Sequence, residues 1–184
     1  MRLHQAIAFC TSSDGTRIAT ASCGAGPVLL RAAHWLSHVA YDLDSPVWRP
    51  WVEALARRHR YVRYDPRGCG LSERHCADLT LAAWHRGFEA VAEAVAGTVD
   101  GGRFALLGMS QGGALAVEYA VRHPERVSHL VLFNAYAQGG RVRARDDAER
   151  LEAERLVNFV RIGWGRENPA FCRFFTHLFL PGGT

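Results

Sequence analysis

The most constraining feature of this sequence is a set of short apolar runs that alternate with stretches of helical spacing. Val28–Leu30 and Phe104–Leu107 are two such runs, and Val127–Phe133 ends in a third. Continuous apolar runs of this length are typical of strands that are buried on both faces of a sheet. Because strands and helices alternate along the chain, we predict an α/β fold, with a mostly parallel sheet and helices on both of its faces.

The predicted order of elements begins with an antiparallel hairpin. Ala6–Cys10 and Thr16–Ala21 are predicted strands on either side of a Ser13-Asp14-Gly15 turn. The remaining predicted strand is Tyr61–Tyr64. The predicted helices are Pro50–Arg58, Leu81–Ala96, Gly112–Arg122 and Arg145–Ile162. We expect Asp146 or Asp147 to cap the last of these helices.

The 184 residues leave room for one main domain and a smaller segment. The strand–helix pattern ends near Ala137, and Gln138-Gly139-Gly140 is typical of a flexible joint. We expect a core over residues 1–137 and a helical, cap-like segment over residues 138–184. Because no strand is predicted after residue 137, we expect the chain to stop inside the helical segment, before the last strands of the sheet.

The net charge of +4 does not by itself indicate nucleic-acid binding. All 22 basic residues are arginine, and the densest stretch, Arg141–Arg155, interleaves them with acidic residues. That mixture is typical of a solvated helix face. No apolar run approaches the roughly 18 residues of a membrane span, and the N-terminus lacks the pattern of a signal peptide. We therefore predict a cytoplasmic protein that binds neither nucleic acid nor a membrane.

The cysteine spacing argues against a metal centre. The five cysteines are scattered and form no C-x-x-C pair. We interpret them as small, buried or half-buried residues in a reducing compartment. Arg74-His75-Cys76 offers only two adjacent ligands of the kind that zinc requires. We predict no metal and no other cofactor.

One motif carries chemistry, Gly108-Met109-Ser110-Gln111-Gly112. It lies between a predicted buried strand and a predicted helix, which is the context of a nucleophile elbow. In such an elbow the serine adopts a strained backbone conformation, and a Cβ at a flanking glycine would collide with a neighbouring strand or helix. The N–H groups that begin the helix then face developing negative charge. The alternative is a glycine-rich turn with an incidental serine.

These motifs resemble those of the α/β-hydrolase superfamily of serine hydrolases. The segment Asp65–Ser72 is similar to the Asp-x-Arg-Gly-x-Gly-x-Ser pattern that follows the fourth strand in that family. His123–Val127, which reads His-Pro-Glu-Arg-Val, is similar to the segment before the sixth strand. More narrowly, Trp35–His38 and Ser45–Trp48 resemble hydrolase-like domains that are fused to helix-turn-helix transcription regulators. The resemblance implies an α/β-hydrolase fold.

The resemblance also implies roles for individual residues. Ser110 is the implied nucleophile, and the backbone N–H of Gln111 is one implied donor to the oxyanion. We place the second donor in the loop after the third strand, at Trp35, with His34 one residue away as the alternative. The implied substrates are small ester or acyl compounds, and no cofactor is implied. The particular substrate is not implied, because functions on this fold are diverse.

The rest of the catalytic triad is not identifiable in the sequence. The family places its acid, and then its histidine, after the elbow in chain order. His123 and His129 are interpreted as structural residues, whereas His177 in the helical segment stays open as a base. Some relatives carry the acid at the end of the sixth strand, where this chain has Asn134.

Further candidates are the loop histidine His34 and two aromatic residues of the helical segment. His34 lies near the expected mouth of the site and is a candidate for substrate binding. Trp164 and Phe175 are candidates for lining an apolar ligand pocket. Packing of the helical segment against the sheet is the alternative for both aromatic residues.

We therefore predict a serine hydrolase of small ester or acyl compounds, weakly active or inactive because its base is missing. One alternative is a non-catalytic domain that senses a small apolar ligand for an attached or partner regulator. Another is a truncated product without activity. The run Leu130–Phe133 is expected to form an open apolar sheet edge, which predicts self-association.

Overall fold

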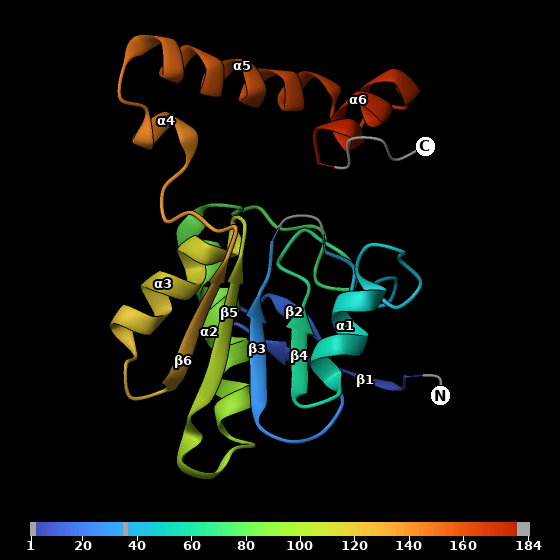
Figure 1. Ribbon diagram of the computed structural model, residues 1–184, viewed down its shortest axis with the longest axis vertical. Coiled ribbons are helices and arrows are strands. Elements are labelled where there is room, and N and C mark those ends of the chain that lie inside the picture. The colour runs from blue at the N-terminus through green and yellow to red at the C-terminus, as the bar shows by residue number, and fades with distance from the viewer. Residues whose placement is uncertain (1–2, 35–36, 180–184) are drawn as a thin grey trace. The chain divides into compact units, whose positions relative to one another are not determined.

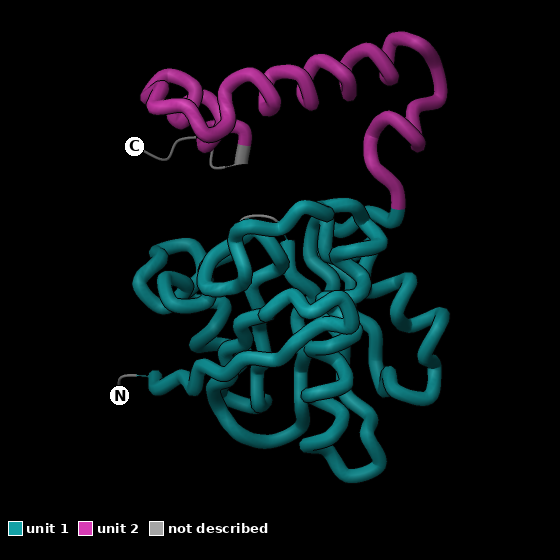
Figure 2. Tube along the Cα trace, turned by 180° about the vertical axis from the view of Figure 1, so that it is seen from behind, with its two compact units in different colours: residues 1–137 teal, residues 138–184 magenta. Residues whose placement is uncertain are grey.

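The computed structural model describes residues 3–34 and 37–179. The chain divides into two compact units (Figure 2), unit 1 over residues 1–137 and unit 2 over residues 138–184. Their boundary falls in the glycine-containing segment where the strand–helix pattern of the sequence ends. All of the described strands belong to unit 1.

Unit 1 is built around one six-stranded sheet. Its strands are β1 (Gln5–Thr11), β2 (Arg17–Cys23), β3 (Val28–Ala32), β4 (Arg60–Tyr64), β5 (Phe104–Met109) and β6 (Val127–Phe133). They lie in the order β1-β2-β4-β3-β5-β6. The hairpin of β1 and β2 is antiparallel, and β2 pairs antiparallel with β4. Strands β3, β4, β5 and β6 run parallel to one another, so their carboxyl ends meet at one edge of the sheet (Figure 1). The predicted fold class is confirmed.

Helices cover both faces of this sheet. They are α1 (Arg49–Ala56), α2 (Leu81–Ala96), the short 3₁₀ helix η1 (Asp100–Gly102) and α3 (Gly112–Arg122). Pro50 lies in the first turn of α1, where its missing N–H removes no helical hydrogen bond. Thr80 caps α2, because its hydroxyl accepts a hydrogen bond from the N–H of Ala83 at 3.3 Å.

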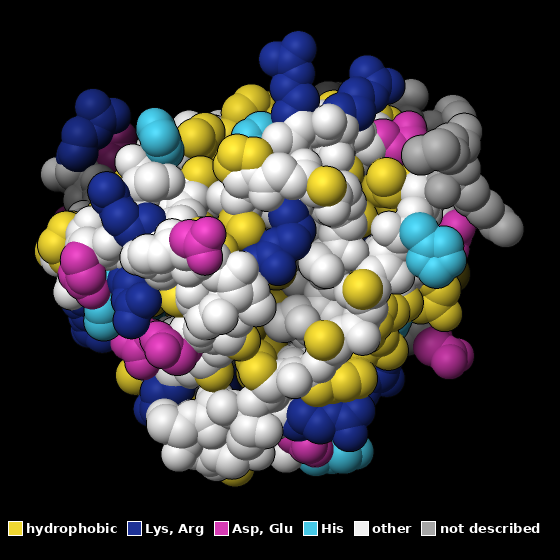
Figure 3. Space-filling view, turned by 90° about the horizontal axis from the view of Figure 1, so that it is seen from below, with side chains coloured by type: hydrophobic (Ala, Val, Ile, Leu, Met, Phe, Trp, Pro, Cys, Tyr) yellow, Lys and Arg dark blue, Asp and Glu magenta, His cyan; other side chains and the backbone are white. Residues whose placement is uncertain are grey.

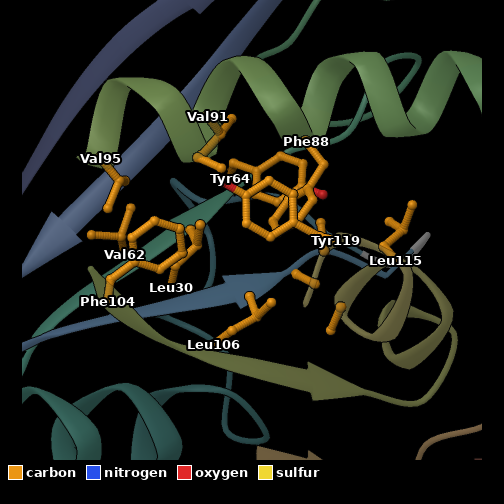
Figure 4. Close-up of a cluster of buried hydrophobic side chains, with 14 of the residues drawn as sticks. Leu30, Val62, Tyr64, Phe88, Val91, Val95, Phe104, Leu106, Leu115 and Tyr119 are labelled. Carbon is orange, nitrogen blue, oxygen red and sulfur yellow. The ribbon is translucent and has the colours of Figure 1, made fainter. Parts of the chain in front are cut away.

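The larger hydrophobic core lies between the sheet and helices α2 and α3. Side chains of α2 point toward the strand residues on that face (Figure 4). Because successive strand residues point to opposite faces, Leu30 and Leu106 belong to this core. Their neighbours Leu29 and Leu107 belong to a second cluster, which includes Val52 of α1. The central strands are therefore covered on both faces, as their continuous apolar runs predict.

Strand β6 differs from the central strands. It lies at the edge of the sheet, and its last four side chains are between 39% and 50% exposed, so the burial predicted from its apolar run is not observed. The physical reason is position, because a strand at the edge has a neighbouring strand on one side only. The apolar edge predicted at Leu130–Phe133 is present in the described sheet.

The described part of unit 2 is helical. Its helices are α4 (Gly140–Arg143), α5 (Asp147–Gly163) and α6 (Pro169–Phe179). Asp146 caps α5 as predicted, since its carboxylate accepts a hydrogen bond from the N–H of Glu149 at 2.8 Å. The ring of Phe159 on α5 lies 4.8 Å from that of Phe171 on α6, centroid to centroid. Aromatic contacts thus join these two helices.

Candidate active site

The turn between β5 and α3 has the backbone geometry that its glycine–serine motif predicts. Ser110 has a φ of +49°, in the left-handed region that residues other than glycine rarely adopt. A Cβ at Gly108 would lie 2.9 Å from the Cβ of Ala116 on α3. A Cβ at Gly112 would lie 2.5 Å from the carbonyl oxygen of Ala32 on β3. Only glycine fits on both sides of the strained serine.

The chain that follows β6 supports this turn. The N–H of Ser110 donates to the carbonyl oxygen of Phe133 at 3.3 Å, and the N–H of Tyr136 donates to the carbonyl oxygen of Ser110 at 3.5 Å. Between these two residues Asn134 has a φ of +43°. Two strained residues other than glycine therefore lie at the ends of neighbouring strands. Backbone strain of this kind gathers at functional sites, where the surrounding structure holds it in place.

Helix α3 begins beside the serine. Gln111 occupies the N-cap position of α3, and its backbone N–H meets no acceptor among residues 3–34 and 37–179. An N–H at the start of a helix can stabilise negative charge on a bound group. Within the described residues of unit 1, neither a histidine nitrogen nor a carboxylate is hydrogen-bonded to Oγ of Ser110. The turn thus places the hydroxyl of Ser110 next to the start of a helix, which is the geometry that the predicted nucleophile and oxyanion donor require.

The second predicted donor, Trp35, lies outside the described residues. The neighbouring His34 is buried, and its ring stacks on Trp48 with 4.8 Å between centroids. Burial, together with the nearby Arg31 guanidinium, lowers the pKa of His34 to about 3. The ring is therefore neutral at pH 7.

Asp65 joins the loop after β3 to the loop after β4. Its Oδ1 atom accepts hydrogen bonds from the Ser37 hydroxyl at 2.7 Å and from the Val39 N–H at 2.9 Å. Its Oδ2 atom accepts from the Leu71 N–H at 2.9 Å. The carboxylate is completely buried. Asp65 thereby fixes the segment that directly follows residues 35 and 36.

A buried charged cluster was not found by sequence reasoning. Arg31, Arg63 and Asp42 are each at most 3% exposed. The Asp42 carboxylate accepts a hydrogen bond from Arg63 and lies 3.5 Å from the Arg31 guanidinium. Two guanidinium groups thus share one carboxylate, which leaves a net positive charge in the interior. The one signal in the sequence that could have revealed this cluster is Arg31, an arginine inside the otherwise apolar strand Val28–Ala32.

The other candidate histidines lie at three separate elements, and in the described part of unit 1 neither His123 nor His129 is hydrogen-bonded to Ser110. His123 ends α3, where its ring lies 4.7 Å from that of Tyr119. His129 is exposed on β6, and His177 is exposed on α6 in unit 2. The structural roles of His123 and His129 therefore stay predictions, and His177 stays an open candidate for the base.

Trp164 and Phe175 contact each other within unit 2, with 5.4 Å between ring centroids. Phe175 also stacks on Phe171 at 5.7 Å and is 7% exposed, whereas Trp164 is 49% exposed. These contacts join α6 to the end of α5. Phe175 thus packs inside unit 2, and the ligand-lining role of both residues stays a prediction.

A cavity of about 250 Å³ opens beside the elbow. Its walls come from the loop after β4, from the start of α2 and from the residue after Ser110. The lining residues are Arg67, Gly68, Cys69, Leu79, Leu81, Trp84 and Gln111. Sequence reasoning did not find this cavity, because three separate segments form it.

Features of some other protein classes are absent from the part of the chain that the structure describes. No group of three His, Cys, Asp or Glu side chains there is placed to hold a metal ion. No helix in that part is long and apolar enough to cross a membrane. On the face shown in Figure 3, arginine and acidic side chains are interspersed.

Known proteins resemble this chain in sequence and in structure. The model of the alpha/beta hydrolase fold family matches residues 37–171. A protein of Azorhizobium caulinodans named "Putative carbamate hydrolase RutD" is 36% identical over 91 residues, which cover 50% of this chain and 33% of that protein. The pimeloyl-acyl-carrier protein methyl ester esterase of Nitrosomonas europaea is 36% identical over 109 residues, which cover 59% and 37%.

Among solved structures, a hydrolase from Pseudomonas aeruginosa PA01 matches with a TM-score of 0.60 and 28% identity, over 91% of this chain and 64% of that one. The chain spans about a third of the length of the curated relatives that it matches. The family model covers the loop after β3 from residue 37 onward, the elbow and most of unit 2. On the sheet order, the strained serine turn and these matches, the chain belongs to the alpha/beta hydrolase fold family.

Proposed function

We propose that this chain carries the nucleophile of a serine hydrolase that acts on small ester or acyl compounds. The observation that carries the proposal is the backbone of Ser110, which is strained at +49° between a buried strand and a helix. A serine in this position exposes its hydroxyl at the carboxyl edge of the sheet. Relatives named as a methyl ester esterase and a carbamate hydrolase support the same class of substrate.

In the proposed reaction, Ser110 attacks the substrate carbonyl and the backbone N–H of Gln111 donates a hydrogen bond to the oxyanion. We assign the second donor to the N–H of Trp35, with His34 as its neighbour in the same loop. The hydrogen bonds of Asp65 to Ser37 and Val39 support this assignment, because they anchor the segment that follows. Acyl transfer to serine needs no cofactor, and we place the reaction in the cytoplasm.

The proposal predicts slow turnover by the 184-residue chain. An elbow serine without a general base keeps only the contribution of the oxyanion site and of substrate binding, roughly 10³–10⁴-fold over water. With p-nitrophenyl acetate we expect slow acetylation of Ser110, measured by peptide mass spectrometry, that Ser110→Ala removes and that Ser13→Ala, a change at an exposed turn serine, leaves intact. Absence of an acetyl group on Ser110 in the unchanged chain would refute the assignment. Many turnovers per second, lost in His177→Ala, would instead identify His177 as the base.

A second candidate function is a non-catalytic, ligand-sensing domain of a helix-turn-helix regulator. Asn134 favours it, because an amide occupies the end of β6, where some relatives carry a carboxylate. The narrower resemblance of Trp35–His38 and Ser45–Trp48 also favours it. A sensor would bind a small ester, acyl or apolar ligand, and neither nucleic acid nor a membrane, through this chain. Binding of p-nitrophenyl acetate without acylation of Ser110 would support the sensor over the hydrolase.

A further inference from the structure

The cavity beside the elbow is lined by apolar side chains that are open to solvent. Leu79 and Leu81 are 59% and 55% exposed, and the half-buried Trp84 lines the cavity and also packs against the main core. Leu81 and Trp84 are three residues apart on α2, so they share one face of that helix. Exposed apolar side chains that gather around a hollow, rather than lying scattered, are typical of a surface that binds a ligand.

Gly68 shapes the side of the cavity that the loop after β4 forms. It has a φ of +78°, and a Cβ at this position would lie 3.2 Å from Cδ2 of Leu79. A larger residue at position 68 would therefore be strained and would push the Leu79 side chain away. The N–H of Gly68 donates to the carbonyl oxygen of Glu73 at 2.8 Å. The loop after β4 is thus tightly folded where it forms the cavity wall.

The volume of the cavity and the chemistry of its wall fit one aromatic ring. An apolar cavity of about 150 Å³ holds benzene, so a volume of about 250 Å³ has room for a ring with a short substituent. The indole of Trp84 offers an aromatic partner, and aromatic rings attract one another beyond the effect of the area that they bury. The thiol of Cys69 lines the same cavity, and sulfur atoms also make favourable contacts with aromatic rings.

The cavity adjoins the proposed reaction centre, because Gln111 lines it and directly follows Ser110 in the chain. We propose that this cavity is a specificity subsite for one aromatic ring, which packs against Trp84 and the side chains of Leu79 and Leu81. An aliphatic ring of the same size fills the volume but lacks the contact between aromatic rings. That the ring belongs to the substrate of Ser110 rests on the proposed function, whereas the binding of the ring does not.

Alkylation of Cys69 by iodoacetamide measures occupancy of the cavity without catalysis. The full chain carrying Ser110→Ala is alkylated at pH 9, because burial raises the pKa of the Cys69 thiol. Trypsin cleaves after Arg67 and Arg74, so mass spectrometry resolves the peptide of Cys69 from those of the other cysteines. The exposed Cys172 on α6 is the reference for the reagent. The probes are benzyl alcohol and cyclohexylmethanol, which carry an aromatic and an aliphatic ring on the same substituent.

We expect benzyl alcohol to slow the alkylation of Cys69 and to leave that of Cys172 unchanged. Cyclohexylmethanol should need a roughly threefold higher concentration for equal protection, which corresponds to the loss of one contact between aromatic rings. Since cyclohexylmethanol is the more apolar of the two probes, unspecific apolar binding predicts the opposite order.

Three variants locate the binding. Trp84→Leu, which keeps an apolar wall and removes the aromatic ring, should abolish the preference for benzyl alcohol. Leu79→Asp, which places a charge in the wall, should abolish protection by both probes. Val121→Asp, the same change from an apolar to a charged side chain at an exposed position of α3, should leave protection intact.

Circular dichroism establishes that each variant is folded. Absence of protection by both probes in the folded Ser110→Ala chain would overturn the subsite. Equal or stronger protection by cyclohexylmethanol while Trp84 is present would overturn the preference for an aromatic ring. Neither result concerns the nucleophile, which is tested by the acetylation of Ser110 with p-nitrophenyl acetate, so failure of the subsite and failure of the proposed function are distinguishable.

Discussion

At the scale of single residues, strain and buried charge gather near the carboxyl edge of the sheet. Ser110 and Asn134 are the described residues other than glycine with a positive φ, and each such conformation costs on the order of 1–3 kcal/mol. Arg31, Arg63 and Asp42 add a buried cluster with a net positive charge. A fold keeps such unfavourable groups only where neighbouring contacts hold them in place, as the hydrogen bonds of Phe133 and Tyr136 do for Ser110.

His34 provides a prediction of pH dependence. Its pKa in the folded chain is about 3, below the ordinary value of 6.5, so below pH 6.5 the unfolded chain binds a proton that the folded chain does not. The stability from the neutral ring is fully present above pH 6.5 and is lost as the pH falls from 6.5 toward 3. Between pH 7 and pH 5 the loss is about 2 kcal/mol.

The measurement is the free energy of unfolding in urea at pH 7 and pH 5. The unchanged chain should lose about 2 kcal/mol more than His34→Gln over this interval, and His75→Gln, at an exposed loop histidine, should behave like the unchanged chain. Equal pH dependence in the unchanged chain and in His34→Gln would contradict the low pKa.

The conformation of individual residues could be predicted from the sequence only where a local pattern allowed a single conformation. Gly108 and Gly112 flank a serine between a strand and a helix, and steric exclusion then leaves a single geometry. The Arg31–Asp42–Arg63 cluster was missed, because it depends on three separate segments meeting in space. The cavity beside Gln111 was missed for the same reason.

At the scale of elements, continuous apolar runs correctly predicted the central strands. A strand that is buried on both faces has apolar residues at successive positions, without the alternation of apolar and polar residues of a half-exposed strand. The same pattern failed for the burial of β6. Its run Leu130–Phe133 is as apolar as the others, yet position in the sheet decides exposure, and that position follows from pairing between distant segments.

The edge strand β6 carries a prediction about association. In the described sheet, its outer N–H and C=O groups pair with no other strand and lie beside exposed apolar side chains, a combination that favours pairing with another chain. We propose that the 184-residue chain self-associates through β6. Val131→Lys, a charge on this edge, should reduce the associated fraction, whereas Ile7→Lys on the opposite edge strand β1 should not.

Size-exclusion chromatography with light scattering measures this association. A monomer at all micromolar concentrations would show that the edge does not pair. A reduction in the Ile7→Lys chain that matches the reduction in Val131→Lys would place the contact on β1 instead.

At the scale of the molecule, unit 1 assembles the elbow from β3, β5, α3 and the end of β6, and unit 2 forms its own aromatic contacts. Family membership follows from this assembly and from the matches, whereas the catalytic role of Ser110 is the central claim that has to be tested. The claim depends on geometry that no single element provides, since the glycines at 108 and 112 contact two different neighbours.

The most direct test is to identify the residue that a fluorophosphonate modifies. The full chain is treated with the reagent, digested and mapped by mass spectrometry, alongside Ser110→Ala and Ser13→Ala. We expect slow modification confined to Ser110, none in Ser110→Ala, and an unchanged yield in Ser13→Ala, because the half-buried Ser110 lies beside the N–H that we propose as an oxyanion donor. Modification of another residue while Ser110 stays unmodified would contradict the account.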